Sequence, residues 1–235
     1  MSLRLAVFAS GGGSNLQALL DRFNRPSAAD SPIRGVLVVS DRENAGALDR
    51  ARADGVDAVV IPVAGRPMDF VARELLGSIE SADVDLIALA GYLRLVPPAV
   101  VRTFRNRIVN IHPALLPAFG GQGMFGLRVH RAVLESGATV TGPTVHLVDE
   151  AYDRGRIIAQ WPVPVLAADT PESLAARVLR VEHRLYPAAI EALARTLTVG
   201  APVHRFGPQS AAAFHLSTEL TPSEGDVRRA LGLED

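Results

Sequence analysis

The stretch LRLAVFASGGGSNLQALLDRF, residues 3–23, decides the fold class. Residues 3–9 form an apolar run that ends at Ser10 and three glycines, which is the pattern of a buried strand leading into a tight loop. Residues 16–23 follow as a predicted helix. A strand, a glycine-rich loop and a helix in this order predict the first unit of an α/β fold.

The loop between this strand and this helix is a predicted anion site. Backbone N–H groups at the start of a helix lie at the positive end of its dipole, and glycines let an anion come close to the backbone. The residues expected to bind it are Gly12, Gly13, Ser14 and Asn15. The alternative is a plain tight turn with Ser14 as N-cap, but three glycines where one would make the turn favour the anion.

A single phosphate monoester fits this loop better than a dinucleotide does. The dinucleotide fingerprint requires glycine or alanine three residues after Gly13, and Leu16 stands there. Asp41 imitates the acidic residue that follows the second strand in such proteins, so a nicotinamide cofactor remains a weaker alternative.

Further along the chain, predicted strands alternate with predicted helices. This alternation predicts a mostly parallel, twisted sheet with helices on both faces. The predicted strands are residues 34–39, 58–61, 85–89 and 108–112, and the predicted helices are residues 45–53 and 70–79.

The pattern changes after residue 112. A glycine-rich loop at residues 120–126 and a helix at 129–136 precede two strand-like runs, 139–148 and 156–165, which predict a long hairpin. Thr170-Pro171 predicts the N-cap and first turn of a helix that ends near Arg195. We expect a domain at residues 1–195 and a tail at residues 196–235, in which TPSE at residues 221–224 predicts a capping box and a short helix.

Composition excludes several classes of function. The chain has 235 residues, a formal net charge of −1 and no cysteine. We therefore expect no disulfide framework and no attraction to nucleic acid. All 24 basic residues are arginine, which excludes lysine Schiff-base chemistry and a Walker lysine. No apolar run approaches the length of a membrane span and no signal peptide is evident, so we expect a cytoplasmic protein.

NIHPALLP, residues 110–117, closes the strand predicted at residues 108–112. Side chains two apart on a strand share a face, so Asn110 and His112 point together. Ligands of doubly wound sheets bind at the carboxyl ends of the strands. An amide donor beside a proton carrier suits the oxyanion of an acyl transfer. The alternative is a histidine that is only part of the core.

Several motifs, in the same order, resemble the folate-dependent phosphoribosylglycinamide formyltransferase family over residues 3–194. They are SGGGSNLQA at residues 10–18, AGYLRL at 90–95, NIHPALLP at 110–117, TVHLVD at 144–149, Asp153 with Gly155, IIAQ at 157–160, and Glu182-His183 with Tyr186-Pro187. The resemblance implies a Rossmann-like fold. It also implies transfer of a formyl group from 10-formyltetrahydrofolate, as co-substrate, to the amine of glycinamide ribonucleotide, without a metal and without a covalent enzyme intermediate.

The resemblance also assigns roles to residues. It implies that Asn110, His112 and Asp153 are catalytic and that Glu182 faces the glycinamide group. The anion of the glycine loop becomes the phosphate of the ribonucleotide. The folate site falls on Leu93, Arg94, Leu95, Val96 and Asp149. A carboxylate close to His112 leads us to expect a raised pKa for this histidine.

The chain departs from the family pattern at residues 120–126, where an insertion of about five residues replaces a short turn. The arginine that meets the folate tail has no clean match, and Arg66 is the nearest candidate. Formyltetrahydrofolate hydrolase, another formyltransferase and a noncatalytic phosphometabolite-binding protein are the alternatives, and we expect a monomer or a homodimer. Zinc bound by His112, His130 and His146 is a weak alternative, because no closely spaced ligand pair supports it.

Overall fold

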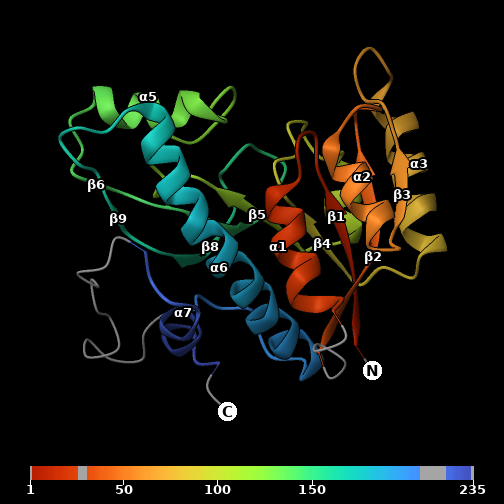
Figure 1. Ribbon diagram of the computed structural model, residues 1–235. Helices are drawn as coiled ribbons and strands as arrows, with labels where there is room; N and C mark the ends of the chain where they lie inside the picture. Colours follow the sequence, from red (N-terminus) through yellow and green to blue (C-terminus); the bar gives the residue numbers. More distant parts are fainter. Residues whose placement is uncertain (1, 26–30, 207–220, 234–235) are drawn as a thin grey trace. The chain divides into compact units, whose positions relative to one another are not determined.

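The computed structural model describes residues 2–25, 31–206 and 221–233. The chain forms two compact units, whose helices and strands are labelled in Figure 1. The first unit comprises Met1–Asn110 and Val148–Glu150, and the second comprises Ile111–Leu147 and Ala151–Asp235. The boundary falls within one strand, so this strand contributes residues to both units.

The first unit contains a parallel sheet. Its strands are β1 (Leu3–Phe8), β2 (Ile33–Ser40), β3 (Asp57–Val60), β4 (Leu86–Leu89) and the first residues of β5 (Ile108–His112). They follow the order β3-β2-β1-β4-β5, and each neighbouring pair is parallel. In the register, Phe8 lies beside Leu89, and Leu89 lies beside Asn110. The loops that follow β1 and β4 therefore begin at the same edge of the sheet, beside Asn110.

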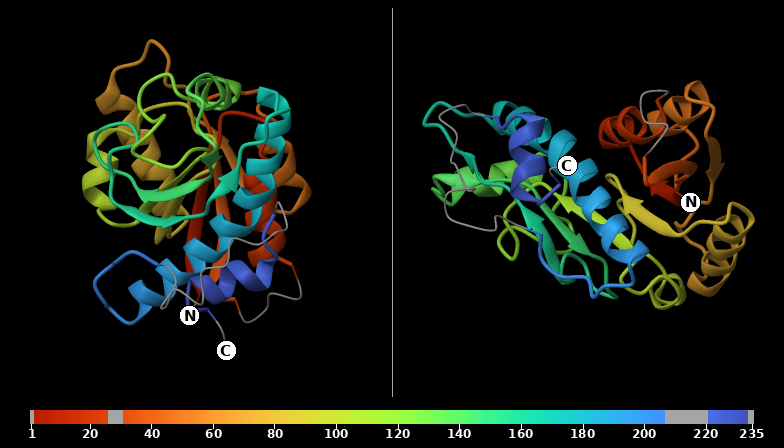
Figure 2. Two further views of the ribbon diagram at one scale, coloured as in Figure 1. Left: turned by 90° about the vertical axis from the view of Figure 1, so that its left-hand side faces the viewer. Right: turned by 90° about the horizontal axis from the view of Figure 1, so that it is seen from below.

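The described residues of the first unit form four helices: α1 (Ser14–Phe23), α2 (Gly46–Ala53), α3 (Met68–Ser81) and α4 (Pro98–Thr103). Helices α1 and α2 contact each other on one side of the strands, and α3 and α4 contact each other on the other side (Figure 2). Apolar side chains of α3 and α4 pack with those of the strands in one buried cluster. Helix α4 was not predicted, because it is short and starts at a pair of prolines.

The second unit contains the end of β5 and the predicted hairpin. The hairpin strands are antiparallel, but each predicted long strand is broken in two. One pair is β7 (Thr144–Leu147) with β8 (Ile157–Gln160), and the other is β6 (Val140–Thr141) with β9 (Val163–Pro164). The prediction of uninterrupted strands was wrong because Pro143 and Pro162 stand at the breaks and proline cannot donate to a ladder.

The strand order of the whole sheet is β3-β2-β1-β4-β5-β7-β8. Four parallel pairings and one antiparallel hairpin confirm the predicted mostly parallel α/β fold with a C-terminal hairpin.

Helix α6 (Pro171–Thr198) is the long helix of the second unit, and α5 (Leu127–Glu135) packs against it. The predicted N-cap of α6 is confirmed, since the Thr170 side chain accepts a hydrogen bond from the amide of Ser173. Pro171 is the first residue of the helix, where its fixed φ suits the helical conformation and where the N–H that proline lacks would have had no partner within the helix.

Helix α7 (Glu224–Ala230) also packs on α6. The predicted short terminal helix is confirmed, but its capping box was placed wrongly. The helix begins at Glu224, so Ser223 is the N-cap and Asp226, at the third helical position, supplies the return bond. The buried Glu191 of α6 accepts from Arg228 at 2.7 Å. Residues 207–220, which are part of the predicted tail, lie outside the described ranges.

Replacing Gly142 with alanine is expected to destabilise the fold strongly. Its φ is +143°, and a Cβ atom at this position would lie 1.9 Å from the carbonyl oxygen of Trp161. Because the obstacle is backbone of the facing strand, we expect a loss of at least about 3 kcal/mol in the free energy of unfolding, measured with urea. Gly137→Ala is the control, since Gly137 has φ +74° but open space around it. Equal midpoints for both variants would contradict the account.

Candidate active site

The glycine loop of the first unit has the geometry of an anion site. Gly13 is the N-cap of α1, with φ 75° and ψ 32°, and no side chain caps the helix among the described residues. Ser14 is the first residue of the helix, so the alternative with Ser14 as N-cap was wrong. The carbonyl of Gly11 accepts from the amide of Ala47 at 3.1 Å, and the carbonyl of Gly12 accepts from Arg50 Nε at 2.8 Å. With its carbonyls held by α2, the loop can present its N–H groups to a ligand.

The segment after β4 carries four of the predicted folate residues. Leu93, Arg94 and Leu95 are half-buried and Val96 is buried. Arg94 Nε donates to Asp41 Oδ2 at 2.8 Å. This bond occupies one oxygen of the carboxylate that a ribose of a nicotinamide cofactor would need, and the Asp41 side chain is 0% exposed, so the nicotinamide alternative loses its main support.

The other two predicted folate residues also lie in the first unit. Arg66 donates to the carbonyl of Pro62 at 2.8 Å and pairs with Glu74 at 2.9 Å, so its guanidinium group is oriented by protein groups. Asp149 is half-buried. Neither observation tests their predicted contact with folate.

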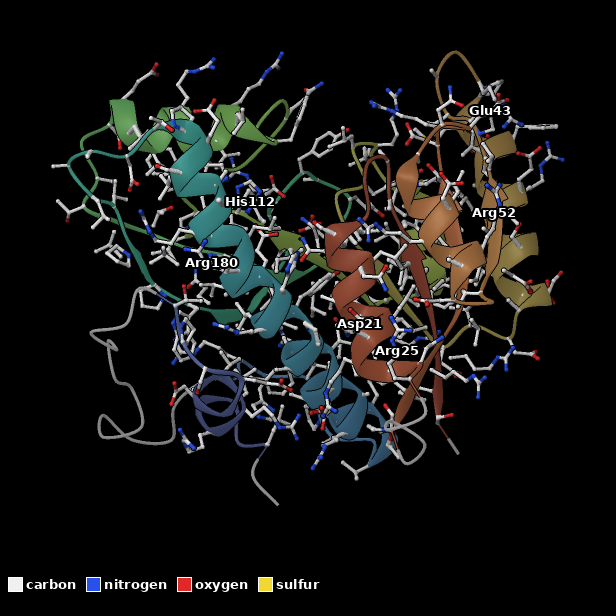
Figure 3. All side chains as sticks on the ribbon, viewed as in Figure 1. Asp21, Arg25, Glu43, Arg52, His112 and Arg180 are labelled. Carbon is white, nitrogen blue, oxygen red and sulfur yellow. The ribbon has the colours of Figure 1, made fainter. Side chains whose placement is uncertain are left out.

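The second unit brings His112 and Asp153 together. His112 ends β5, is buried, and its Nε2 lies 2.9 Å from the carbonyl oxygen of Phe119 (Figure 3). Its Nδ1 lies 3.6 Å from Asp153 Oδ2. Since a carbonyl can only accept, Nε2 carries a proton and Nδ1 faces the carboxylate. Asn110 lies two positions earlier in the same strand, so the pleat turns it to the face of His112.

A second histidine, His146, holds the other oxygen of the same carboxylate. Its Nε2 lies 3.5 Å from Asp153 Oδ1, and its Nδ1 donates to the carbonyl of Leu147, 2.9 Å away. His146 therefore contacts both the carboxylate and the backbone. The sequence could have indicated this position of His146, because Thr144 and His146 stand two residues apart on a strand and therefore share one face.

The glycine-rich loop at residues 120–126 completes the surroundings of the carboxylate. The amide of Gly121 donates to Asp153 Oδ2 at 2.8 Å. A Cβ at Gly120 would lie 3.2 Å from the Cβ of Asp153 and 2.5 Å from a methyl group of Leu116, so glycine permits the close approach. Phe119 and Asp153 both have left-handed backbones, with φ 56° and 53°. Such a conformation costs most for the bulky Phe119, whose carbonyl bonds to His112.

The hairpin fixes the chain that follows His112. The Thr144 hydroxyl donates to the carbonyl of Ala114 at 2.7 Å and accepts from the amide of Leu116 at 3.0 Å. The Gln160 amide donates to the carbonyl of Leu116 and to Thr144 Oγ1, both at 3.0 Å. These bonds explain chemically why threonine and glutamine stand at these two positions.

Burial and hydrogen bonding set the charges in this cluster. Burial raises the pKa of Asp153, but the hydrogen bonds from His146 and the Gly121 amide and the nearby His112 outweigh it, so the pKa is lowered and the carboxylate is ionised at neutral pH. Burial lowers the pKa of His112 and outweighs the opposing effect of Asp153. The expected rise in the His112 pKa was therefore wrong, and this imidazole is neutral at rest.

Two further candidates lie on helices of the second unit. Glu182 is buried in α6. His130 is buried in α5, and its Nδ1 has no hydrogen-bond partner within the described ranges. Over the same residues, no group of three histidine, aspartate or glutamate side chains is placed to hold a metal ion, and no helix is long and apolar enough to cross a bilayer.

Comparison with known proteins assigns the family. Residues 3–190 match the formyl transferase family model. This chain belongs to the formyl transferase family. Among its relatives are the chloroplastic phosphoribosylglycinamide formyltransferases of Arabidopsis thaliana, 48% identical over 194 residues, and Vigna unguiculata, 46% identical over 191 residues. Each alignment covers 81% of this chain, but 65% of the first relative and 60% of the second.

Solved structures of formyl transferase family relatives have the same fold. Glycinamide ribonucleotide transformylase 1 from Symbiobacterium toebii is 45% identical, with a TM-score of 0.75 over 83% of this chain and 88% of that chain. Phosphoribosylglycinamide formyltransferase from Brucella melitensis is 41% identical, with a TM-score of 0.74 over 83% of this chain and 96% of that chain.

Stability is expected to fall in acid because of His130. Burial, with the neighbouring His112 adding to it, lowers the pKa of His130 from 6.5 to about 4. Because the pKa of His130 is lower in the folded chain than in the unfolded chain, its contribution to the free energy of unfolding is fully present above pH 6.5 and is lost as the pH falls through 4. The expected loss is on the order of 2 kcal/mol. Urea unfolding between pH 7.5 and 4 should show a shallower loss for His130→Gln than for the parent. The exposed His204→Gln is the control, and parallel pH profiles for the parent and His130→Gln would contradict the assignment.

Proposed function

We propose that this chain transfers a formyl group from 10-formyltetrahydrofolate to the amine of glycinamide ribonucleotide, a step of purine biosynthesis. The observation that supports this most directly is the ionised Asp153, whose side chain is 11% exposed, between His112 and His146, with Asn110 two positions before His112 in β5. Relatives at 48% and 46% identity bear the name of this activity.

The reaction needs a site for an oxyanion. The neutral amine attacks the formyl carbon, a C–N bond forms, and negative charge grows on the formyl oxygen. The Asn110 amide donates to this oxygen, and so does His112, which becomes charged by taking one proton of the attacking amine by way of water and Asp153. The bond to folate N10 then breaks, and this proton passes by way of water and Asp153 to N10. Tetrahydrofolate leaves, and no covalent bond to the protein forms.

The remaining candidates are proposed to bind the two substrates. The N–H groups of Gly12 and Gly13 with the side chains of Ser14 and Asn15 bind the phosphate of the ribonucleotide, and Glu182 binds near its amine. Residues 93–96, with Arg66 and Asp149, bind the folate. We infer a cytoplasmic enzyme that works as a monomer or homodimer without metal or nucleic acid, with the catalytic domain at residues 1–195 and a tail at 196–235.

Removing the charge of Asp153 is expected to abolish most of the turnover. In Asp153→Asn the shape is kept but the proton carrier is lost, so kcat should fall by roughly a hundredfold or more. Asn110→Ala and His112→Ala should lose on the order of a hundredfold each. Folate absorbance is followed with both substrates, and Glu150→Gln, which alters an exposed carboxylate paired with Arg102, is the control. Circular dichroism confirms folding.

The same assay separates the alternatives. Consumption of 10-formyltetrahydrofolate without the ribonucleotide would identify a hydrolase, and no consumption with both substrates would identify a binding protein. A folded Asp153→Asn or His112→Ala variant that turns over at the parent rate would contradict the mechanism.

Gly13→Ala is expected to weaken ribonucleotide binding. A Cβ at Gly13 would lie 2.8 Å from Ala47 Cα, so α2 and the glycine loop would separate. The KM for the ribonucleotide should rise at least about tenfold, the scale of losing one or more charge-assisted bonds, whereas the KM for folate should change far less. Gly55→Ala is the control, since Gly55 has φ +67° but open space around it. Equal changes in both KM values would argue against a phosphate site.

A further inference from the structure

We propose that Ser10 is a positioning residue that fixes the folate-binding segment of this enzyme without touching folate. The proposal rests on the function inferred above. Ser10 follows β1, precedes the glycine loop, and is 2% exposed. Its amide donates to the carbonyl of Gly91 at 3.1 Å, and its hydroxyl accepts from the amide of Leu93 at 2.9 Å. One residue therefore holds the segment on both sides of Tyr92.

The hydroxyl determines where the segment lies. Leu93 begins the stretch that is proposed to bind folate, and its N–H points at Ser10 rather than along a strand. Gly91 has φ +74°, so the chain turns sharply just before the two bonds. Removing the hydroxyl leaves the amide of Leu93 without its acceptor. A partly buried N–H without an acceptor is costly, so the segment is expected to shift toward another partner or toward water.

A second bond holds the same segment from the neighbouring strand. Asp41 follows β2, its side chain is 0% exposed, and its Oδ2 accepts from Arg94 Nε at 2.8 Å. The Arg94 side chain remains 39% exposed. Because Nε is taken, the carboxylate fixes the plane of the guanidinium group and leaves its terminal nitrogens for other acceptors. Ser10 and Asp41 thus fix consecutive residues of one segment.

Loss of the Ser10 hydroxyl should affect the segment proposed to bind folate and not the glycine loop proposed to bind phosphate. The glycine loop has anchors of its own, because Ala47 and Arg50 hold its carbonyls. The bond from Ser10 to Gly91 uses the backbone amide and survives a side-chain change. Loss of the hydroxyl is therefore expected to disturb the Leu93 side and to leave the phosphate site in place.

Steady-state kinetics of Ser10→Ala test the proposal. The KM for 10-formyltetrahydrofolate should rise about tenfold, the scale of one lost hydrogen bond at the site, while kcat and the KM for the ribonucleotide stay within about twofold. Asp41→Asn should shift the same KM in the same direction. Ser40→Ala is the matched control, because Ser40 is a fully buried serine whose hydroxyl accepts from the amide of Arg42 at 3.1 Å and makes no bond to residues 91–94.

Three results would overturn the proposal. Folate KM values equal to those of Ser40→Ala would show that the bond positions nothing. A rise in the ribonucleotide KM alone would assign Ser10 to the phosphate site. Lower thermal stability with both KM values unchanged would make its role purely structural. If Ser10→Ala does not fold, Ser10→Cys, a weaker acceptor of similar size, is measured instead. Equilibrium binding of an unreactive folate analogue reads the same effect without turnover, so an inactive parent would overturn the proposed function and not this inference.

Discussion

A buried carboxylate that stays ionised is the constraint on which the second unit depends. Water that would stabilise the charge of Asp153 is largely excluded, so protein donors must replace it. The Gly121 amide donates to one oxygen, His146 Nε2 lies 3.5 Å from the other, and the neutral ring of His112 lies 3.6 Å away. Each of these groups comes from a different segment, so the carboxylate fixes where several loops and strands of this unit must lie.

Two residues around this carboxylate have unfavourable backbone conformations. Asp153 itself takes the left-handed conformation, which aspartate tolerates better than most residues. Phe119 takes it too, and aromatic residues seldom do. Strain of this kind persists only where the surroundings determine the conformation, and here the Phe119 carbonyl is the partner of His112. The glycine-rich loop is therefore a structural part of the site, since Gly120 allows the approach of Asp153 and Gly121 donates to it.

The sequence predicts the features that depend on local pattern. The buried strands β1 and β5, the hairpin and the N-cap of α6 follow from apolar runs and from capping residues. The breaks at Pro143 and Pro162 also have a local cause, which the long apolar runs concealed. The sign of the His112 pKa shift could not be predicted, because it depends on how much water the folded chain removes around the ring, and a sequence shows the partner but not the burial. The backbone acceptor at Phe119 and the backbone donor at Gly121 carry no residue-type signal at all.

In the proposed reaction, the lowered pKa of His112 suits the oxyanion-stabilising role that we propose for it better than the raised pKa that the sequence led us to expect. An imidazolium that is present at rest would attract any anion, and its interaction would not be reserved for the oxyanion of the transition state. A neutral imidazole beside an ionised Asp153 has little attraction for an uncharged formyl oxygen. As negative charge grows on that oxygen, the proton affinity of the ring rises, and the carboxylate stabilises the positive charge when it forms. The interaction is then strongest in the transition state, and burial, which opposes charge in the resting enzyme, becomes the source of that selectivity.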